Sequence, residues 1–155
     1  MPCSKPNSKA MKGKMASLVD VNLLLALLHE RHAFSAKAVA WLDGQSGNGS
    51  VAICRVVQMG VLRILTRPSI MKGDLLTPSE FWQGWSALMA DARFFMVSEP
   101  SQLERFWREL TVSLPRGQCA ETDAYLAAFA QSGGYRMATF DKGFQRYAEL
   151  DLELL

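Results

Sequence analysis

The sequence predicts an α/β domain with a mainly parallel sheet that is covered by helices on both faces. Short apolar runs of strand length alternate along the chain with longer stretches of helical length and composition. Glycine, proline and small polar residues separate these runs, and no internal repeat is present. The 155 residues match one ordinary domain, and a hydrophobic content of 49% is enough to build its core.

The first strand is expected at residues 15–19, where "MASLV" is short and apolar. Helices are expected next at 21–32 and 33–45, and the second of them ends in "GQSGNGS", which has the composition of a loop. Residues 51–54, "VAIC", then read as a second buried strand. This order is one strand–helix–strand unit.

The middle of the chain repeats the alternation. A helix is expected over 55–68, closed by Pro68, and residues 69–77 form a connection. Thr77 and Pro78 begin the next helix, because proline is favoured at the first helical position. "RFFMVS", residues 93–98, is the third strand.

The last third contains two more helices and two strands. The helix expected over 99–114 ends before Pro115, and a glycine pair stops the one over 119–134. Residues 135–140, "YRMATF", are strand-like, and "LDLELL" at 150–155 is expected to form an edge strand. Ligands of such sheets gather at the carboxyl ends of the strands, which directs attention to the polar residues there.

Composition excludes several classes of protein. No apolar run approaches the roughly 20 residues that span a bilayer, and the N-terminus lacks a secretory apolar segment. Cys3, Cys54 and Cys119 are odd in number and lie far apart, which indicates neither a disulfide framework nor a zinc site. These features predict a protein of the reducing cytoplasm.

Charge divides the chain into two parts. Four lysines without any acid precede the first apolar run, so we expect residues 1–14 to be a flexible basic tail, with a nucleic-acid-binding arm as the alternative. The net charge of the whole chain is +2, but in residues 15–155 acidic residues outnumber basic ones. The expected single domain, 15–155, therefore lacks the basic surface typical of nucleic-acid-binding domains.

Three aspartates are expected at one edge of the sheet. Asp20 follows the first strand and Asp141 follows "YRMATF", so both lie at carboxyl ends. Asp123 shares a helix face with Leu126 and Ala127, the face that should pack on the sheet, whereas Glu121 points elsewhere with Ala124 and Tyr125. Three converging carboxylates repel one another unless a proton, a cation or a metal offsets their charge.

The carboxylates allow two interpretations. Hard oxygen ligands without nearby His or Cys select Mg²⁺ or Mn²⁺ rather than zinc. Alternatively, Asp20 and Asp123 only begin helices, and Asp141 is a turn residue. Taken together, the three favour the metal site.

Four stretches resemble the PIN-domain family, and in particular its VapC-type toxins: "LVDVNLLLALLHERH", "CRVVQMGVLRILTRPSI", "TDAYLAAFA" and "GGYRMATFDKGF". They occur in the order found in that family. The resemblance implies a three-layer α/β/α sandwich and a PIN-like domain over 15–155. It also implies an acidic pocket that holds divalent metal, in which Asp20, Asp123 and Asp141 match three of the family's acids.

A fourth acid of the family commonly falls where this chain has Gln58. Gln58 shares a face with Leu62 and Leu65, so a polar group points where apolar ones are expected. Its carbonyl can ligate weakly, but it cannot act as a base. This departure raises the question of whether the site holds one metal ion or two.

The resemblance further implies hydrolysis of RNA phosphodiesters by a metal-activated water, a cognate antitoxin and a homodimer. Four arginines on segments leading toward the site are candidates to hold the RNA backbone: Arg55, Arg63, Arg67 and Arg116. Two alternatives remain open. One is a PIN nuclease with a housekeeping role and no antitoxin, and the other is a catalytically weak or silent binding module, which Gln58 supports best.

Overall fold

The computed structural model describes residues 15–155, so the basic tail expected at 1–14 lies outside the described residues. These residues form a five-stranded sheet in which each adjacent pair of strands is parallel. The strands are β1 (Ser17–Val19), β2 (Val51–Cys54), β3 (Phe94–Val97), β4 (Arg136–Thr139) and β5 (Leu152–Leu154). Their order across the sheet is β3-β2-β1-β4-β5, which confirms the predicted parallel α/β fold.

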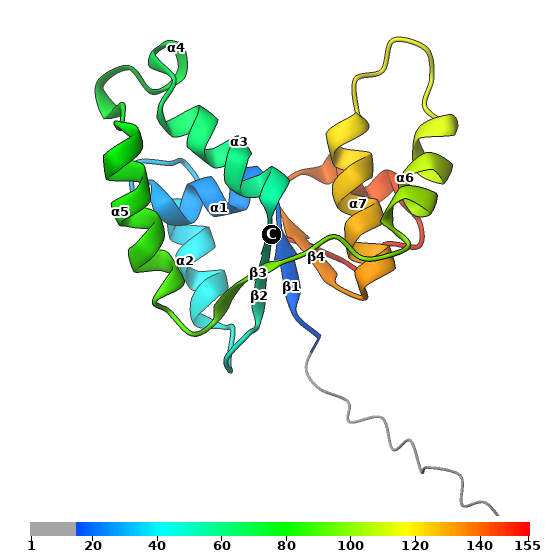
Figure 1. The fold of residues 1–155 in the computed structure, drawn as a ribbon, viewed down its shortest axis with the longest axis horizontal. Helices are drawn as coiled ribbons and strands as arrows, with labels where there is room; N and C mark the ends of the chain where they lie inside the picture. Colours follow the sequence, from blue (N-terminus) through cyan, green and yellow to red (C-terminus); the bar gives the residue numbers. More distant parts are fainter. Residues whose placement is uncertain (1–14) are drawn as a thin grey trace, which may run out of the picture.

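Helices cover the two faces of the sheet as separate layers (Figure 1). The strand order places β1 beside β4. From β1 the chain continues to β2 on one side of this pair, and from β4 it continues to β5 on the other side. Such a switch point opens a crevice at the carboxyl ends of the two strands. The helices are α1 (Val21–Leu28), α2 (Ser35–Asp43), α3 (Arg55–Leu65), α4 (Pro68–Met71), α5 (Pro78–Met89), α6 (Leu103–Val112) and α7 (Glu121–Gly133).

The central strands are buried on both faces, as their unbroken apolar sequences predict. Every residue of β1 and β2 is buried, whereas the edge strands β3 and β5 are mostly half-buried. The core extends from these strands into the helices through large, fully buried side chains, among them Phe81, Phe129 and Phe144. In residues 15–155, no helix is long and apolar enough to cross a membrane.

The ends of the helices follow the signals in the sequence. Thr77 caps α5 in a reciprocal pair with Glu80, and Pro78 occupies the first turn. Gly134 ends α7 with a left-handed φ of 69°, which glycine adopts without steric cost. These local signals therefore explain where two of the longest helices stop and start.

Two expectations for the helices were wrong. Residues 69–77 are not a plain connection, because Pro68 begins the short helix α4 and a 3₁₀ turn, η1 (Lys72–Asp74), follows it. The helix before it already ends at Leu65. Proline is favoured at the first position of a helix, and it is also common just after a helix has ended. The sequence alone did not show which of the two applies to Pro68.

The burial of α7 also differs from the prediction. Ala124 and Tyr125 were expected on an outward face, but the whole stretch Ala124–Ala130 is buried. Helix α6 lies along α7 on the side away from the sheet (Figure 1). A helix that is packed between a sheet and a second helix is buried all round.

Helix α3 approaches α1 closely beside the sheet edge. A Cβ atom on Gly60 would lie 2.7 Å from Cγ2 of Val21. The missing side chain at Gly60 therefore lets α3 pack against the first turn of α1, directly after Asp20.

Candidate active site at the carboxyl edge of the sheet

Asp20 lies where β1 ends and α1 begins. It is the N-cap of α1, and its Oδ1 accepts a 2.8 Å hydrogen bond from the backbone N–H of Leu23. Only 4% of its surface is exposed. Capping was the alternative interpretation of Asp20, and this hydrogen bond leaves the second carboxylate oxygen for other partners.

Thr139 links Asp20 to the end of the neighbouring strand. Its Oγ1 donates a 2.6 Å hydrogen bond to Oδ2 of Asp20 and accepts a 2.9 Å hydrogen bond from the backbone N–H of Asp141. The register of the parallel strands explains the contact, because Val19 pairs with Ala138 and the next residues are Asp20 and Thr139. Thr139 is completely buried, so this link fixes Asp20 relative to β4.

Asp141 begins the 3₁₀ turn η2 (Lys142–Arg146). Its Oδ1 accepts a 2.7 Å hydrogen bond from the backbone N–H of Gly143. A Cβ on Gly143 would lie 2.9 Å from that same oxygen, so glycine is the residue that leaves room for this carboxylate. Asp141 is thus a turn residue, as the alternative interpretation had it, and still lies at the predicted edge.

Asp123 lies in the first turn of α7 and is half-buried. Unlike the other two aspartates, it makes no hydrogen bond or ion pair with another residue of the described chain. Leu126 and Ala127, with which it shares a face, are buried, while Glu121 is exposed, as predicted. Asp123 therefore presents a free carboxylate.

The three aspartates affect one another electrostatically. Burial raises the pKa of Asp20, the hydrogen bonds from Thr139 and Leu23 lower it, and the charges of Asp141 and Asp123 raise it further. Burial and then the charge of Asp141 raise the pKa of Asp123, against which Arg146 acts in the opposite direction. The fold therefore gathers into one electrostatic cluster three acids that are far apart in the sequence.

Gln58 is buried on α3, with 4% of its surface exposed. Its side-chain carbonyl accepts a hydrogen bond from the guanidinium of Arg55, one turn earlier on the same helix. The expectation that a polar group lies on this face is therefore confirmed. The bond from Arg55 satisfies this carbonyl, which leaves it less able to act as a weak metal ligand.

The donor set can be compared with the needs of a metal ion. In residues 15–155, no group of three or more His, Cys, Asp or Glu side chains is arranged to hold one as it stands. The chemistry of the set nevertheless fits Mg²⁺ or Mn²⁺, because all three side chains are carboxylates, and burial together with neighbouring negative charge raises the pKa values of Asp20 and Asp123. A bound cation offsets both effects. Asp123, which no hydrogen bond holds, is the side chain best able to turn toward one.

A cavity of about 460 Å³ adjoins the cluster on the side of α3. Val21 and Thr122, the sequence neighbours of Asp20 and Asp123, line it together with Arg63. The other arginines named from the sequence are also exposed, Arg55 at the start of α3, Arg67 before α4 and Arg116 between α6 and α7. Of the four, Arg63 is the one that lines the same cavity as the sequence neighbours of Asp20 and Asp123.

Sequence reasoning missed two residues on the other side of the cluster. Arg146 affects the pKa of Asp123, and both Asp123 and Asp141 raise the pKa of Tyr147, after the larger effect of burial. The only signal in the sequence was their closeness to Asp141 in "DKGFQRY". Where the side chains of Arg146 and Tyr147 lie relative to Asp141 depends on the 3₁₀ turn between them, which that spacing does not reveal.

Comparisons with known proteins agree with this geometry. The family model of the PIN domain matches residues 17–150. Ribonuclease VapC41 of Mycobacterium tuberculosis is 35% identical over 142 residues, which are 89% of this chain and 97% of that protein.

Solved structures with the same fold are also similar. VapBC-1 from nontypeable Haemophilus influenzae superposes with a TM-score of 0.65 at 16% identity, over 90% of this chain and 98% of the other. VapC20 of Mycobacterium tuberculosis, a sarcin–ricin loop cleaving toxin, superposes with a TM-score of 0.62 at 16% identity, over 88% of this chain and 98% of the other. At such identities the likeness concerns the fold.

Proposed function

The chain belongs to the PIN-domain family, and from this premise we propose that it is a divalent-metal-dependent endoribonuclease acting as the toxin of a toxin–antitoxin pair. The observation that carries the proposal is the electrostatic cluster of Asp20, Asp123 and Asp141 at the switch point of the sheet. The identity of 35% to a protein named as a ribonuclease, over nearly the whole of both chains, supports RNA as the substrate.

Asp20, Asp123 and Asp141 are the residues that would hold Mg²⁺ or Mn²⁺. When bound, such a cation neutralises charge on the attacked phosphate and lowers the pKa of water. Asp20 is suited to a fixed position, because hydrogen bonds from Leu23 and Thr139 hold both of its oxygens. Asp141 is tied to Gly143 through Oδ1, which leaves its Oδ2 without a hydrogen bond in the described chain.

Asp123 is the candidate to accept the proton of the attacking water on one of its carboxylate oxygens. It makes no hydrogen bond in the described chain that would compete for those oxygens. The substrate backbone would pass over the cavity that Val21, Thr122 and Arg63 share, where the guanidinium can contact a phosphate.

Cleavage of single-stranded RNA by the purified chain, with Mg²⁺, with Mn²⁺ or with EDTA, tests this function. We expect cleavage only with metal, and the changes Asp20→Asn and Asp123→Asn should each lower the rate by about 100-fold or more. Glu121→Gln is the matched control, since Glu121 lies on the same helical turn as Asp123 but is exposed and apart from the cluster. Equal rates for the parent and Asp20→Asn in Mg²⁺ would contradict the assignment.

A silent binding module is the second candidate, and the buried Gln58 with its bond to Arg55 is the observation in its favour. Calorimetric titration with Mn²⁺ separates the two. Binding that Asp20→Asn abolishes supports the nuclease, and no binding to the parent supports the silent module. Growth arrest on expression would distinguish a toxin from a housekeeping nuclease.

An antitoxin partner, a homodimer and a cytoplasmic location complete the proposal. The antitoxin is supported by fold neighbours that were solved as VapBC and toxin–antitoxin complexes. Co-expression with the product of the adjacent gene should yield a complex without cleavage activity, and the mass of the purified chain in solution tests the dimer. A chain that is fully active as a free monomer would argue against the homodimer and would leave the rest of the proposal unaffected.

A further inference from the structure

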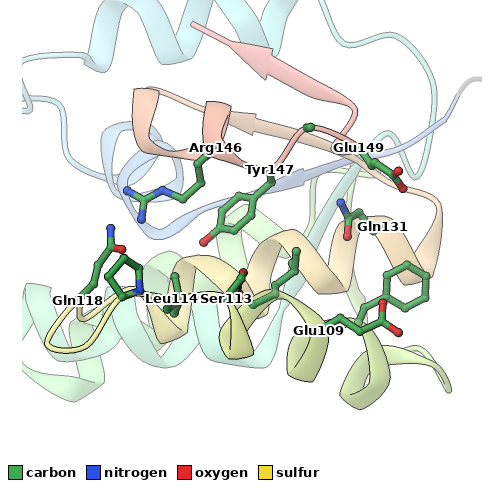
Figure 2. Close-up of a pocket in the computed structure, with 12 residues that line it drawn as sticks. Glu109, Ser113, Leu114, Gln118, Gln131, Arg146, Tyr147 and Glu149 are labelled. Atoms are coloured by element: carbon green, nitrogen blue, oxygen red, sulfur yellow. Dashed lines mark hydrogen bonds between the residues drawn. The ribbon is translucent and has the colours of Figure 1, made fainter.

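A second cavity, of about 590 Å³, lies between α6, α7 and the segment that follows η2. One wall is formed by α6 and the loop after it, with Glu109, Ser113 and Gln118. The other wall is the segment after η2, which carries Tyr147 and Glu149, and the ring of Tyr147 projects toward the first wall (Figure 2). The volume falls within the range of ligand pockets in proteins, about 300–1,000 Å³.

The lining suits a flat, neutral ring with hydrogen-bonding edges. Phe106 and Leu110 supply apolar surface, and the amides of Gln118 and Gln131 supply both donors and acceptors. The charged groups in the lining are two carboxylates, on Glu109 and Glu149, against the one guanidinium of Arg146. This balance disfavours a phosphate group and permits the exocyclic amines of a nucleobase.

Tyr147 lacks the partner that its hydroxyl requires. Its side chain is 7% exposed and lines the cavity, but its hydroxyl makes no hydrogen bond with any described residue. Figure 2 shows the ring lying across the space toward the wall that carries Ser113 and Leu114. The hydroxyl oxygen itself is covered by protein, so Tyr147 contributes the apolar face of its ring to the wall of the cavity.

The cavity and the acidic cluster are neighbours. Arg146 lines the cavity and donates a 2.9 Å hydrogen bond from Nε to the carbonyl of Gly143, whose own backbone N–H donates to Oδ1 of Asp141. A strand with one phosphate at the acids therefore brings its adjoining base to the mouth of this cavity. Sequence-specific recognition of RNA commonly uses such unpaired bases.

We propose that this cavity, the base pocket, binds one unpaired nucleobase of the RNA next to the phosphate that is cut. The inference rests on the proposed function for the identity of the substrate. It assigns base selection to the amides of Gln118 and Gln131, with the ring of the base seated on Phe106 and Leu110.

Binding without metal tests the pocket separately from catalysis. Fluorescein-labelled single-stranded RNA that the chain binds is compared, by anisotropy in EDTA, with versions carrying one abasic site at each position in turn. For the parent chain, one abasic position should weaken binding by about ten-fold, the typical effect of losing one stacked base. Two pocket variants are compared with the parent: one carries both Gln118→Ala and Gln131→Ala, and the other carries Ala148→Phe. Both should lose this difference between positions.

Gln83→Ala is the matched control, because Gln83 is exposed on α5 and does not line the pocket. The change Ala148→Phe fills the space without removing a polar group, so it guards against a folding defect of the double variant. The pocket proposal is overturned if every abasic position has the same effect on the parent, or if both pocket variants discriminate as the parent does.

The two proposals can fail independently. If the parent cuts no RNA in Mg²⁺ or Mn²⁺ but shows the positional effect, the pocket stands and the nuclease function falls. If it cuts RNA without any positional effect, the reverse holds. If the pocket variants keep the positional effect but lose binding to the antitoxin, the pocket serves a protein partner and the base proposal is wrong.

Discussion

Thr139 Oγ1 donates a 2.6 Å hydrogen bond to Oδ2 of Asp20, across 119 residues of sequence. The same oxygen accepts the backbone N–H of Asp141, so one buried hydroxyl joins the carboxyl ends of β1 and β4. This bond determines how Asp20 is oriented and lowers its pKa against the effect of burial.

Replacing Thr139 by valine should weaken both the fold and the site. The substitution keeps the shape but removes the donor to Asp20 and the acceptor for Asp141, which costs about 1–3 kcal/mol for each buried group left unpaired. The pKa of Asp20 should rise further, and the acidic limb of the pH–rate profile should shift upward with it. Urea unfolding and the pH profile measure the two effects.

The control for this change is Thr66→Val. Thr66 also donates a hydrogen bond from its hydroxyl, in this case to the backbone carbonyl of Leu62, but it lies at the far end of α3. Its loss should affect neither the pH profile nor the cleavage rate. If Thr139→Val unfolds at the urea concentration of the parent, the bond from Thr139 has no structural role.

Asp123→Asn should stabilise the metal-free protein at neutral pH. Burial and Asp141 raise the folded-state pKa of Asp123 above its ordinary value of 3.8. A group with a raised folded pKa stabilises fully below that ordinary value and loses this contribution as the pH rises through the folded pKa. The gain from removing the charge is therefore present at pH 7 and disappears as the pH approaches 3.8.

Denaturant unfolding of the parent and of Asp123→Asn, in EDTA at several pH values, measures this difference, with Glu121→Gln as the control. Added Mn²⁺ should reverse the order, because the parent gains a ligand that the variant binds less well. A variant that is less stable than the parent at pH 7 in EDTA would show that Asp123 is not strained by its neighbours.

Gly143→Ala should displace Asp141 without unfolding the protein. The added Cβ would lie 2.9 Å from Oδ1, so the carboxylate must turn and lose its bond from the backbone of residue 143. Weaker Mn²⁺ binding and slower cleavage should accompany a stability change within about 1 kcal/mol. Gly84→Ala is the control, since nothing lies within 4 Å of its added Cβ, and it should stabilise α5 by about 0.5–1 kcal/mol.

Gln58→Glu should increase the affinity for divalent metal. The change adds a negative charge at a buried position where the family commonly carries an acid, although Arg55 already bonds to this side chain and will screen part of the charge. Calorimetry with Mn²⁺ measures the affinity and the number of ions bound. Gln83→Glu adds the same charge on α5, and an equal increase there would mean that net charge alone is responsible.

Much of the fold could be predicted because its signals are local. Alternating apolar runs indicated the parallel sheet, and "LVD" and "TFD" each placed an aspartate directly after a buried strand. The start of α5 followed from Thr77 and Pro78, which act on their own helix turn. Pro68 was misinterpreted because the same residue can end one helix or begin another.

The sequence by itself therefore determined the order of strands and helices, the kind of sheet and the positions of three acids along the chain. Only the tertiary structure decided which distant parts of the chain meet: Thr139 bonds to Asp20, and Tyr147 lines one cavity together with α6. The physical reason is that periodicity reports how a segment faces its own neighbours. Contacts across the sheet depend on strand order and register, which place β1 beside β4 although more than a hundred residues separate them.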